Sequence, residues 1–96
     1  MTRIAINGFG RIGRAFLKLA LKHKDLEIVA VNDLGDIKNF AYLLKYDSAY
    51  GHSGLEVSTP DARTLLVDHK PIRFLSEKEP AKLPWKELRV DIVAVS

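Results

Sequence analysis

The chain has 96 residues, of which 47% are hydrophobic and 28% charged, and this composition is typical of one folded domain. It contains no cysteine, which excludes disulfide bonds, cysteine metal sites and a thiol nucleophile within these residues. The formal net charge of +3 is spread along the chain, so it does not require a nucleic-acid partner.

The first and third predicted elements are β-strands. Residues Arg3–Asn7 show a short alternating apolar pattern that ends at glycine residues, as strands before a tight turn do. Residues Glu27–Asn32 extend the apolar run that begins at Leu26, which is typical of a strand covered on both faces of a parallel sheet. With the helix predicted between them, the first 33 residues are expected to form a βαβ unit.

An amphipathic helix is predicted from Arg11 to about Lys24. Residues at three- and four-residue spacing are expected to form its apolar face: Ile12, Phe16, Leu19 and Ala20. Basic residues are expected on the opposite, solvated face: Arg11, Arg14, Lys18, Lys22 and Lys24. Such a basic stripe can bind nucleic acid, but no aromatic side chains interleave with it to stack on bases. A solvated face is therefore favoured, and nucleic-acid binding is the alternative.

The remaining residues are predicted to add a second helix, a hairpin and a final strand. Asp36 is expected to cap a helix over Ile37 to about Tyr46, and residues 50–54 are expected to form a loop. The later predicted elements are strands at Leu55–Val57, Thr64–Val67 and Ile72–Leu75, at most a short helix at Pro84–Leu88, and a strand at Val90–Val95. We expect an α/β fold in which the second strand lies between the first and the last hairpin strand. The final strand is expected on the other side of the first.

A glycine-rich string, GFGRIG at residues 8–13, lies between the first predicted strand and the helix. An acidic residue, Asp33, follows the last glycine by 20 residues, at the end of the next predicted strand. In this context Gly8 permits a tight turn, Gly10 lets a pyrophosphate approach the backbone, and Gly13 lets the helix pack close to the strand. The pattern predicts the first mononucleotide-binding half of a Rossmann domain, with a parallel sheet and a small added hairpin.

The same pattern also predicts which cofactor is bound. The N–H groups that open the helix would face the phosphates, because the amino end of a helix dipole attracts anions. Asp33 would accept hydrogen bonds from the adenosine ribose and repel a 2′-phosphate, which favours NAD over NADP. The alternative is that the glycine residues only form a turn and Asp33 only caps a helix.

Four segments have sequences that are more specific than the glycine-rich pattern itself: RIAINGFGRIGR at 3–14, VNDL at 31–34, LLKYDS at 43–48 and LPW at 83–85. Together they resemble the amino-terminal part of the glyceraldehyde-3-phosphate dehydrogenase family, and the resemblance extends from Met1 to Val93. It implies NAD as the cofactor and an oxidoreductase of glycolysis as the parent protein. Erythrose-4-phosphate dehydrogenase shares this plan and is the alternative parent.

The resemblance implies a cofactor site around the glycine-rich string and the strand ends. The backbone of Arg11 and Ile12 would meet the pyrophosphate, Ile12 would also line the nicotinamide side, and Asp33 would bind the ribose. Further residues would surround the cofactor: Asn7, Gly8, Phe9, Gly10, Gly13 and Asn32 in the crevice, and Lys78 and Ser96 on the adenosine side. The family commonly has arginine in place of Lys78.

In that family the nucleophilic cysteine, the general-base histidine and the phosphate-binding residues belong to later segments. The 96 residues do not include those segments. We therefore expect residues 1–96 to form part of an NAD-binding domain without the catalytic domain, and to be inactive as an enzyme by themselves.

Partners and location are predicted from the rest of the sequence. The longest apolar run, Ile28–Val31, is far shorter than the roughly 20 residues of a membrane-spanning helix, and the opening residues lack a signal-peptide pattern. A cytoplasmic location and no membrane partner are therefore expected. The three histidine residues, His23, His52 and His69, lack metal-ligand spacing. The final apolar strand would be a free sheet edge, which predicts a homo-oligomer or a complementing polypeptide. A self-associating scaffold without a ligand is the alternative function.

Overall fold

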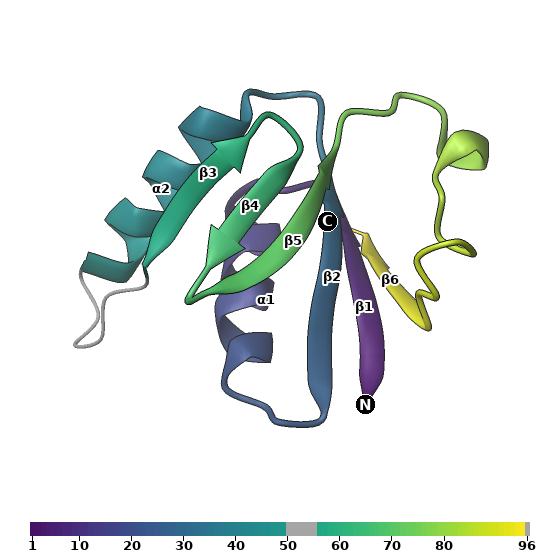
Figure 1. The fold of residues 1–96 in the computed structure, drawn as a ribbon, viewed down its shortest axis with the longest axis horizontal. Coiled ribbons are helices and arrows are strands. Elements are labelled where there is room, and N and C mark those ends of the chain that lie inside the picture. The colour runs from purple at the N-terminus through teal and green to yellow at the C-terminus, as the bar shows by residue number, and fades with distance from the viewer. Residues whose placement is uncertain (50–55, 96) are drawn as a thin grey trace.

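The computed structural model describes residues 1–49 and 56–95, which form a six-stranded sheet and two α-helices (Figure 1). The elements in chain order are β1 (Thr2–Asn7), α1 (Arg11–Leu21), β2 (Leu26–Asn32), α2 (Ile37–Ala49), β3 (Val57–Asp61), β4 (Thr64–Val67), β5 (Lys70–Leu75), a 3₁₀ helix (Pro80–Lys82) and β6 (Ile92–Val95). The strand order across the sheet is β3-β4-β5-β2-β1-β6.

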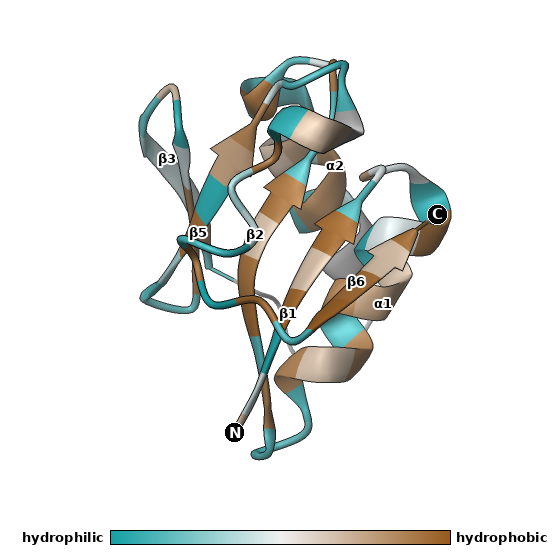
Figure 2. Ribbon diagram, turned by 90° about the vertical axis from the view of Figure 1, so that its right-hand side faces the viewer, coloured by the Kyte–Doolittle hydropathy of each residue, from teal (hydrophilic) through white to brown (hydrophobic). Residues whose placement is uncertain are grey.

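Four neighbouring strands, β5, β2, β1 and β6, run parallel to one another, whereas β3 and β4 add an antiparallel hairpin at one side. Both α-helices cover one face of the sheet, and the segment that joins β5 to β6 crosses on the other face (Figure 2). We call this segment, residues 76–91, the crossover. The predicted α/β fold, a Rossmann-type half with an added hairpin, and the predicted strand order are therefore confirmed.

The core lies between the sheet and the two helices. Strand β1 contributes Ile4 and Ile6, which are 2% and 0% exposed. Three aromatic rings from the glycine loop, α2 and β5 meet above the sheet. The ring centroids of Phe9 and Phe40 are 5.6 Å apart in an edge-to-face arrangement, and those of Phe40 and Phe74 are 5.9 Å apart. This aromatic cluster joins the glycine loop to the rest of the core.

The predicted apolar face of α1 is wrong in part. Ile12 and Leu19 are 73% and 57% exposed, whereas the buried residues of the helix are Gly13, Arg14, Leu17 and Ala20. Arg14 is 8% exposed, and its guanidinium donates to the backbone oxygen of Phe9 at 3.5 Å within the protein. The helix also ends at Leu21, before the predicted end near Lys24.

The hairpin region differs from the prediction at its first strand. Strand β3 begins at Val57 and continues through Pro60 to Asp61, while Leu55 and the predicted loop at 50–54 lie outside the described residues. Proline is tolerated there because β3 is an edge strand and needs no outward hydrogen bond. The predicted turn between β4 and β5 is confirmed. Its residues Asp68 and His69 have φ of 49° and 67°, as in a type I′ turn.

At Pro84–Leu88, where at most a short helix was predicted, the crossover forms turns and no regular helix. Residues 85–89 form hydrogen-bonded turns, in which the N–H of Leu88 donates to the backbone oxygen of Pro84 at 3.0 Å, and the left-handed backbone of Arg89, with φ of 55°, prevents a helix from continuing. A 3₁₀ helix begins earlier in the crossover, at Pro80. Strand β6 starts two residues later than predicted, where Ile92 pairs with Ile4 of β1.

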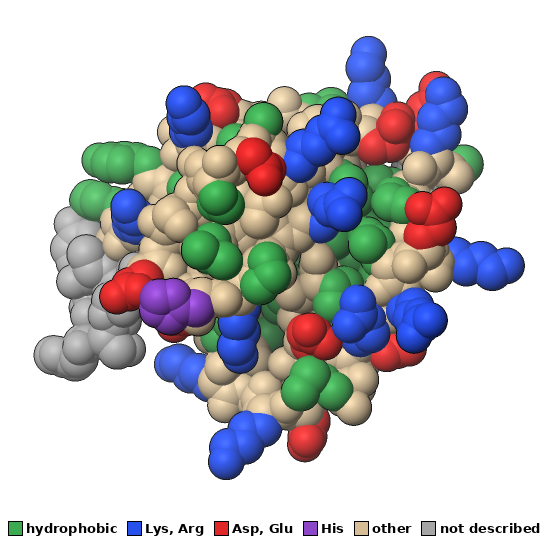
Figure 3. Space-filling view, viewed as in Figure 1, with side chains coloured by type: hydrophobic (Ala, Val, Ile, Leu, Met, Phe, Trp, Pro, Cys, Tyr) green, Lys and Arg blue, Asp and Glu red, His purple; other side chains and the backbone are tan. Residues whose placement is uncertain are grey.

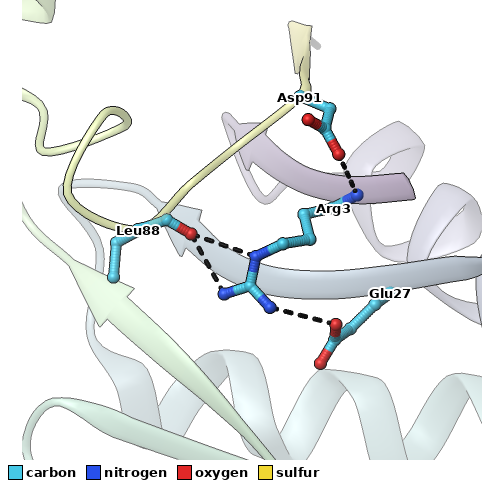
Figure 4. Close-up of polar contacts among 4 residues, drawn as sticks. All are labelled: Arg3, Glu27, Leu88 and Asp91. Carbon is cyan, nitrogen blue, oxygen red and sulfur yellow. Dashed lines mark hydrogen bonds and ion pairs between the residues drawn. The ribbon is translucent and has the colours of Figure 1, made fainter. Parts of the chain in front are cut away.

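The end of the crossover is fastened to the sheet by Arg3 of β1 (Figure 4). Its guanidinium donates to the backbone oxygen of Leu88 at 3.2 and 3.0 Å and to the carboxylate of Glu27 at 3.1 Å. Its backbone N–H donates to the carboxylate of Asp91 at 2.9 Å, and its backbone oxygen accepts the N–H of Asp91 at 2.7 Å. These contacts set the position from which β6 begins.

Candidate functional site

The glycine loop, residues 8–13, connects the carboxyl end of β1 to the amino end of α1. Gly8 turns the chain with φ of 100°, a conformation that favours glycine, and its N–H donates to the backbone oxygen of Asn32 at 2.8 Å. The first backbone bond of α1 runs from the N–H of Arg14 to the oxygen of Gly10 at 2.9 Å. The N–H groups of Arg11, Ile12 and Gly13 therefore have no acceptor within the helix, as at the amino end of any α-helix.

Gly10 is the residue at the amino cap of α1, and it has no side chain that could fill the space in front of the helix. A Cβ atom placed on Gly10 would have no heavy atom within 4 Å. The position beside Gly10 at the amino end of the helix is therefore open, and the helix dipole makes it electropositive. This geometry fits a pyrophosphate, because the phosphate oxygens can approach the backbone without a side chain between them.

Asp33 follows β2 and holds the glycine loop in place. One carboxylate oxygen accepts the N–H of Phe9 at 2.8 Å, and the other accepts the N–H of Gly35 at 2.9 Å. Each oxygen keeps a second acceptor position that ribose hydroxyls can use. The sequence predicted a contact between Asp33 and the ribose. It did not predict that Asp33 holds the glycine loop, because no sequence pattern indicates such a contact.

A shallow cavity of about 320 Å³ lies beside the glycine loop. Its lining residues come from the ends of β1 and β2 and from the start of the crossover: Asn7, Gly8, Asn32, Asp33, Leu34, Glu77 and Lys78. Lys78 is exposed, whereas Asn32 is 5% exposed and contacts both Asn7 and Glu77. The cavity therefore lies between the carboxyl ends of β1 and β2 and residues 77–78, which the sequence analysis placed on the adenosine side.

The structure brings most of the predicted site residues together at the carboxyl ends of β1 and β2. Five of them line the cavity, namely Asn7, Gly8, Asn32, Asp33 and Lys78. Gly10, Arg11, Ile12 and Gly13 lie at the start of α1. Phe9 contributes its backbone to the site, but its side chain is 0% exposed and packs in the core. Ser96 lies outside the described residues.

Other candidate sites gain little support from the structure. In residues 1–49 and 56–95, no group of three His, Cys, Asp or Glu residues is arranged to hold a metal ion. His69 contacts Glu56 at 3.2 Å, with both side chains exposed, and His52 lies outside the described residues. The helices of the described part are too short or too polar to cross a membrane.

The nucleic-acid alternative is weakened by the orientation of α1. Arg14, which the sequence placed in the basic stripe, is 8% exposed and points inward, so the stripe is interrupted. Figure 3 shows lysine and arginine side chains scattered over the visible face and mixed with acidic ones. A scattered charge distribution offers no continuous track for a phosphate backbone on this face.

Comparisons with known proteins agree with this geometry. The family model of the glyceraldehyde 3-phosphate dehydrogenase NAD binding domain matches residues 2–96. The chain is 52% identical over 93 residues to glyceraldehyde-3-phosphate dehydrogenase B, chloroplastic, of Pisum sativum, with 95% of the chain and 21% of that relative covered. It is 46% identical over 96 residues to glyceraldehyde-3-phosphate dehydrogenase 1 of Bacillus cereus, with 100% of the chain and 28% of the relative covered. The corresponding enzyme of Mycoplasma pneumoniae is 52% identical over 94 residues, covering 98% and 28%. The chain thus spans between 21% and 28% of the length of these relatives.

Proposed function

Because the chain belongs to the glyceraldehyde-3-phosphate dehydrogenase family, whose NAD binding domain matches residues 2–96, we propose that it binds NAD at the carboxyl ends of β1 and β2. The observation that carries the proposal is the open position beside Gly10, at the amino end of α1. The neighbouring residue Phe9 donates its N–H to the carboxylate of Asp33 at 2.8 Å, so Asp33 lies next to this position. The backbone N–H groups of Arg11 and Ile12 would hold the pyrophosphate there. Asp33 would hold the adenosine ribose, and Lys78 would lie beside the adenine.

The proposed preference for NAD over NADP rests on two opposite charges in the cavity. Asp33 would repel a 2′-phosphate, whereas Lys78 would attract one. We expect Asp33 to dominate because two backbone hydrogen bonds, of 2.8 and 2.9 Å, hold its carboxylate in one position. Lys78 is exposed, and water and salt therefore screen its charge.

The wider role that we propose is that of the cofactor-binding part of a longer glycolytic dehydrogenase that oxidises glyceraldehyde 3-phosphate. An erythrose-4-phosphate dehydrogenase is the alternative parent. None of the 96 residues is a cysteine, so the thiol nucleophile that the resemblance implies would belong to another part of such a protein. When bound, NAD would supply the hydride acceptor, and these residues would hold and orient it. The cytoplasmic location predicted from the sequence stays a prediction.

Calorimetric titration of the purified chain tests the cofactor assignment directly. NAD and ADP-ribose should both bind, because both carry the pyrophosphate and the adenosine ribose. NADP should bind about five- to 150-fold more weakly, since one unfavourable charge contact changes binding by roughly 1–3 kcal/mol. Equal binding of NAD and NADP would contradict the role of Asp33, and no binding of any of the three would contradict the function.

We further propose that β6 pairs with a second polypeptide, a second copy of this chain being the simplest case. Strand β6 forms one edge of the sheet, and its side chains Ile92 and Val95 are 52% and 78% exposed. An exposed apolar edge with unused backbone hydrogen-bonding groups favours pairing with another strand. This feature also supports the alternative function of a self-associating module.

Replacing Ile92 and Val95 together by lysine should shift the chain toward monomer without unfolding it. Both positions are exposed, so the substitutions add charge to the edge while the half-buried Val93 stays in place. Light scattering over a range of concentrations measures the change in mass. A matched control, Leu34→Lys, changes another exposed apolar residue and should leave the mass unchanged. A wild-type chain that is strictly monomeric at high micromolar concentration would contradict the proposed pairing.

A further inference from the structure

Asn32, the last residue of β2, is buried and uses its side-chain amide fully as a hydrogen-bond donor. The amide nitrogen donates to the side-chain oxygen of Asn7 at 3.0 Å and to the backbone oxygen of Glu77 at 3.0 Å. The amide oxygen accepts the backbone N–H of Glu77 at 2.9 Å. Asn32 therefore holds Glu77 by both of its main-chain polar groups.

These contacts occur where the regular sheet ends. The ladder between β2 and β5 finishes with Asn32 opposite Leu75, and the N–H of Asp33 donates to the oxygen of Leu75 at 3.0 Å. After Leu75 the chain leaves the sheet and enters the crossover. The Asn32 side chain gives Glu77 one donor and one acceptor, as the backbone of a neighbouring strand would. The chain after β5 therefore stays hydrogen-bonded to β2 for two residues beyond the end of the sheet.

The backbone of Asn32 fixes the opposite side of the cavity. Its oxygen accepts the N–H of Gly8 at 2.8 Å, where the glycine loop begins. One residue therefore binds the first glycine of the loop through its backbone and the residue before Lys78 through its side chain. Because Gly8 and Lys78 both line the cavity, Asn32 determines how far apart its two sides lie.

We propose that Asn32 is a positioning residue for the cofactor site, fixing the distance between the glycine loop and the adenosine-side segment 76–79. This inference rests on the proposed NAD site and adds to it the residue that sets its width. Arg3 provides a matched comparison, because it fastens the other end of the same crossover at Leu88 and does not line the cavity.

Amide hydrogen exchange of the free chain, followed by NMR, tests the positioning role without any ligand. Asn32→Ala removes the acceptor of the Glu77 N–H, so exchange at Glu77 should become at least about tenfold faster. Arg3→Met should leave exchange at Glu77 within about twofold, because its hydrogen bonds lie at the far end of the crossover. Unchanged exchange at Glu77 in Asn32→Ala would overturn the proposal.

Titration with ADP-ribose tests whether this position matters for binding. Asn32→Ala should weaken binding about tenfold, whereas Arg3→Met should change it less than about twofold even where it lowers the melting temperature. Asn32→Asp keeps an acceptor for the Glu77 N–H but replaces both donors with a carboxylate oxygen that repels the backbone oxygen of Glu77, so it should also weaken binding.

Two outcomes separate this inference from the proposed function. If Arg3→Met weakens ADP-ribose binding as much as the Asn32 variants do, the effect is general loosening of the crossover and Asn32 has no special positioning role. If the wild-type chain does not bind ADP-ribose, the proposed NAD site is wrong. The exchange of Glu77 still decides in that case whether Asn32 holds the segment.

Discussion

Replacing Asp33 by alanine should weaken NAD binding by about ten- to a hundredfold and narrow the difference between NAD and NADP. A hydrogen bond to a charged group contributes about 1.5–3 kcal/mol, and this contact with the ribose would be lost. The same change removes the carboxylate that would repel a 2′-phosphate, so NADP should lose less affinity than NAD. Calorimetric titration of both cofactors on the variant and the wild type measures the two effects.

The variant should also be less stable, because Asp33 accepts the backbone N–H groups of Phe9 and Gly35. Removing an acceptor from a partly buried N–H group lowers the free energy of unfolding by about 1–3 kcal/mol. Asp36→Ala is the matched control, since the Asp36 carboxylate accepts the N–H of Lys38 at 3.1 Å at the start of α2. It should lower stability by about 1 kcal/mol and leave the ratio of NAD to NADP affinity unchanged. An equal change of this ratio in both variants would contradict the role assigned to Asp33.

Replacing Phe9 by alanine should have the largest effect on stability, a loss of about 3–5 kcal/mol in the free energy of unfolding. The Phe9 side chain is 0% exposed and packs edge to face against Phe40, whose centroid lies 5.6 Å away. Domains of this length unfold with about 5–14 kcal/mol, so the loss would be a large part of the total. Urea denaturation followed by circular dichroism measures it.

Leu19→Ala is the matched control for this substitution. Leu19 is also a large apolar residue, but it is 57% exposed on α1, and alanine is a good helix former. The control should lose less than about 1 kcal/mol. If both variants lost similar amounts, the aromatic cluster of Phe9, Phe40 and Phe74 would not be part of the stabilising core.

The parts of the fold that sequence reasoning predicted are those with strong periodic or spacing signals. The βαβ unit followed from the apolar runs around Ile4 and Ile28 and from the glycine-rich string between them. The strand order followed from the right-handed connections of parallel strands. The position of Asp33 near the glycine loop followed from its place at the end of the second predicted strand, because the carboxyl ends of adjacent parallel strands lie at the same end of the sheet.

The parts that could not be predicted depend on contacts between distant segments. The predicted apolar face of α1 was wrong in part because arginine is usually solvated, yet Arg14 is 8% exposed and its guanidinium donates to the oxygen of Phe9. The extent of β3 was missed because Pro60 argues against a strand unless the strand is known to lie at an edge. The contact of Asn32 with Glu77 joins residues 45 positions apart, and no local pattern predicts it.

Near each end, the crossover is attached through its own main-chain atoms at one residue, in addition to the side-chain contact of Asp91 with Arg3. Arg3 binds the backbone oxygen of Leu88, and Asn32 binds the backbone N–H and oxygen of Glu77. Every residue type has a backbone oxygen, so any residue at position 88 could accept the Arg3 hydrogen bonds. Every type except proline also has a backbone N–H, so any of them at position 77 could pair with Asn32. The intervening residues can therefore change in side chain during evolution while the attachment stays the same. Protein engineers could likewise replace residues 78–87 with a different sequence and keep both ends of the segment where they are.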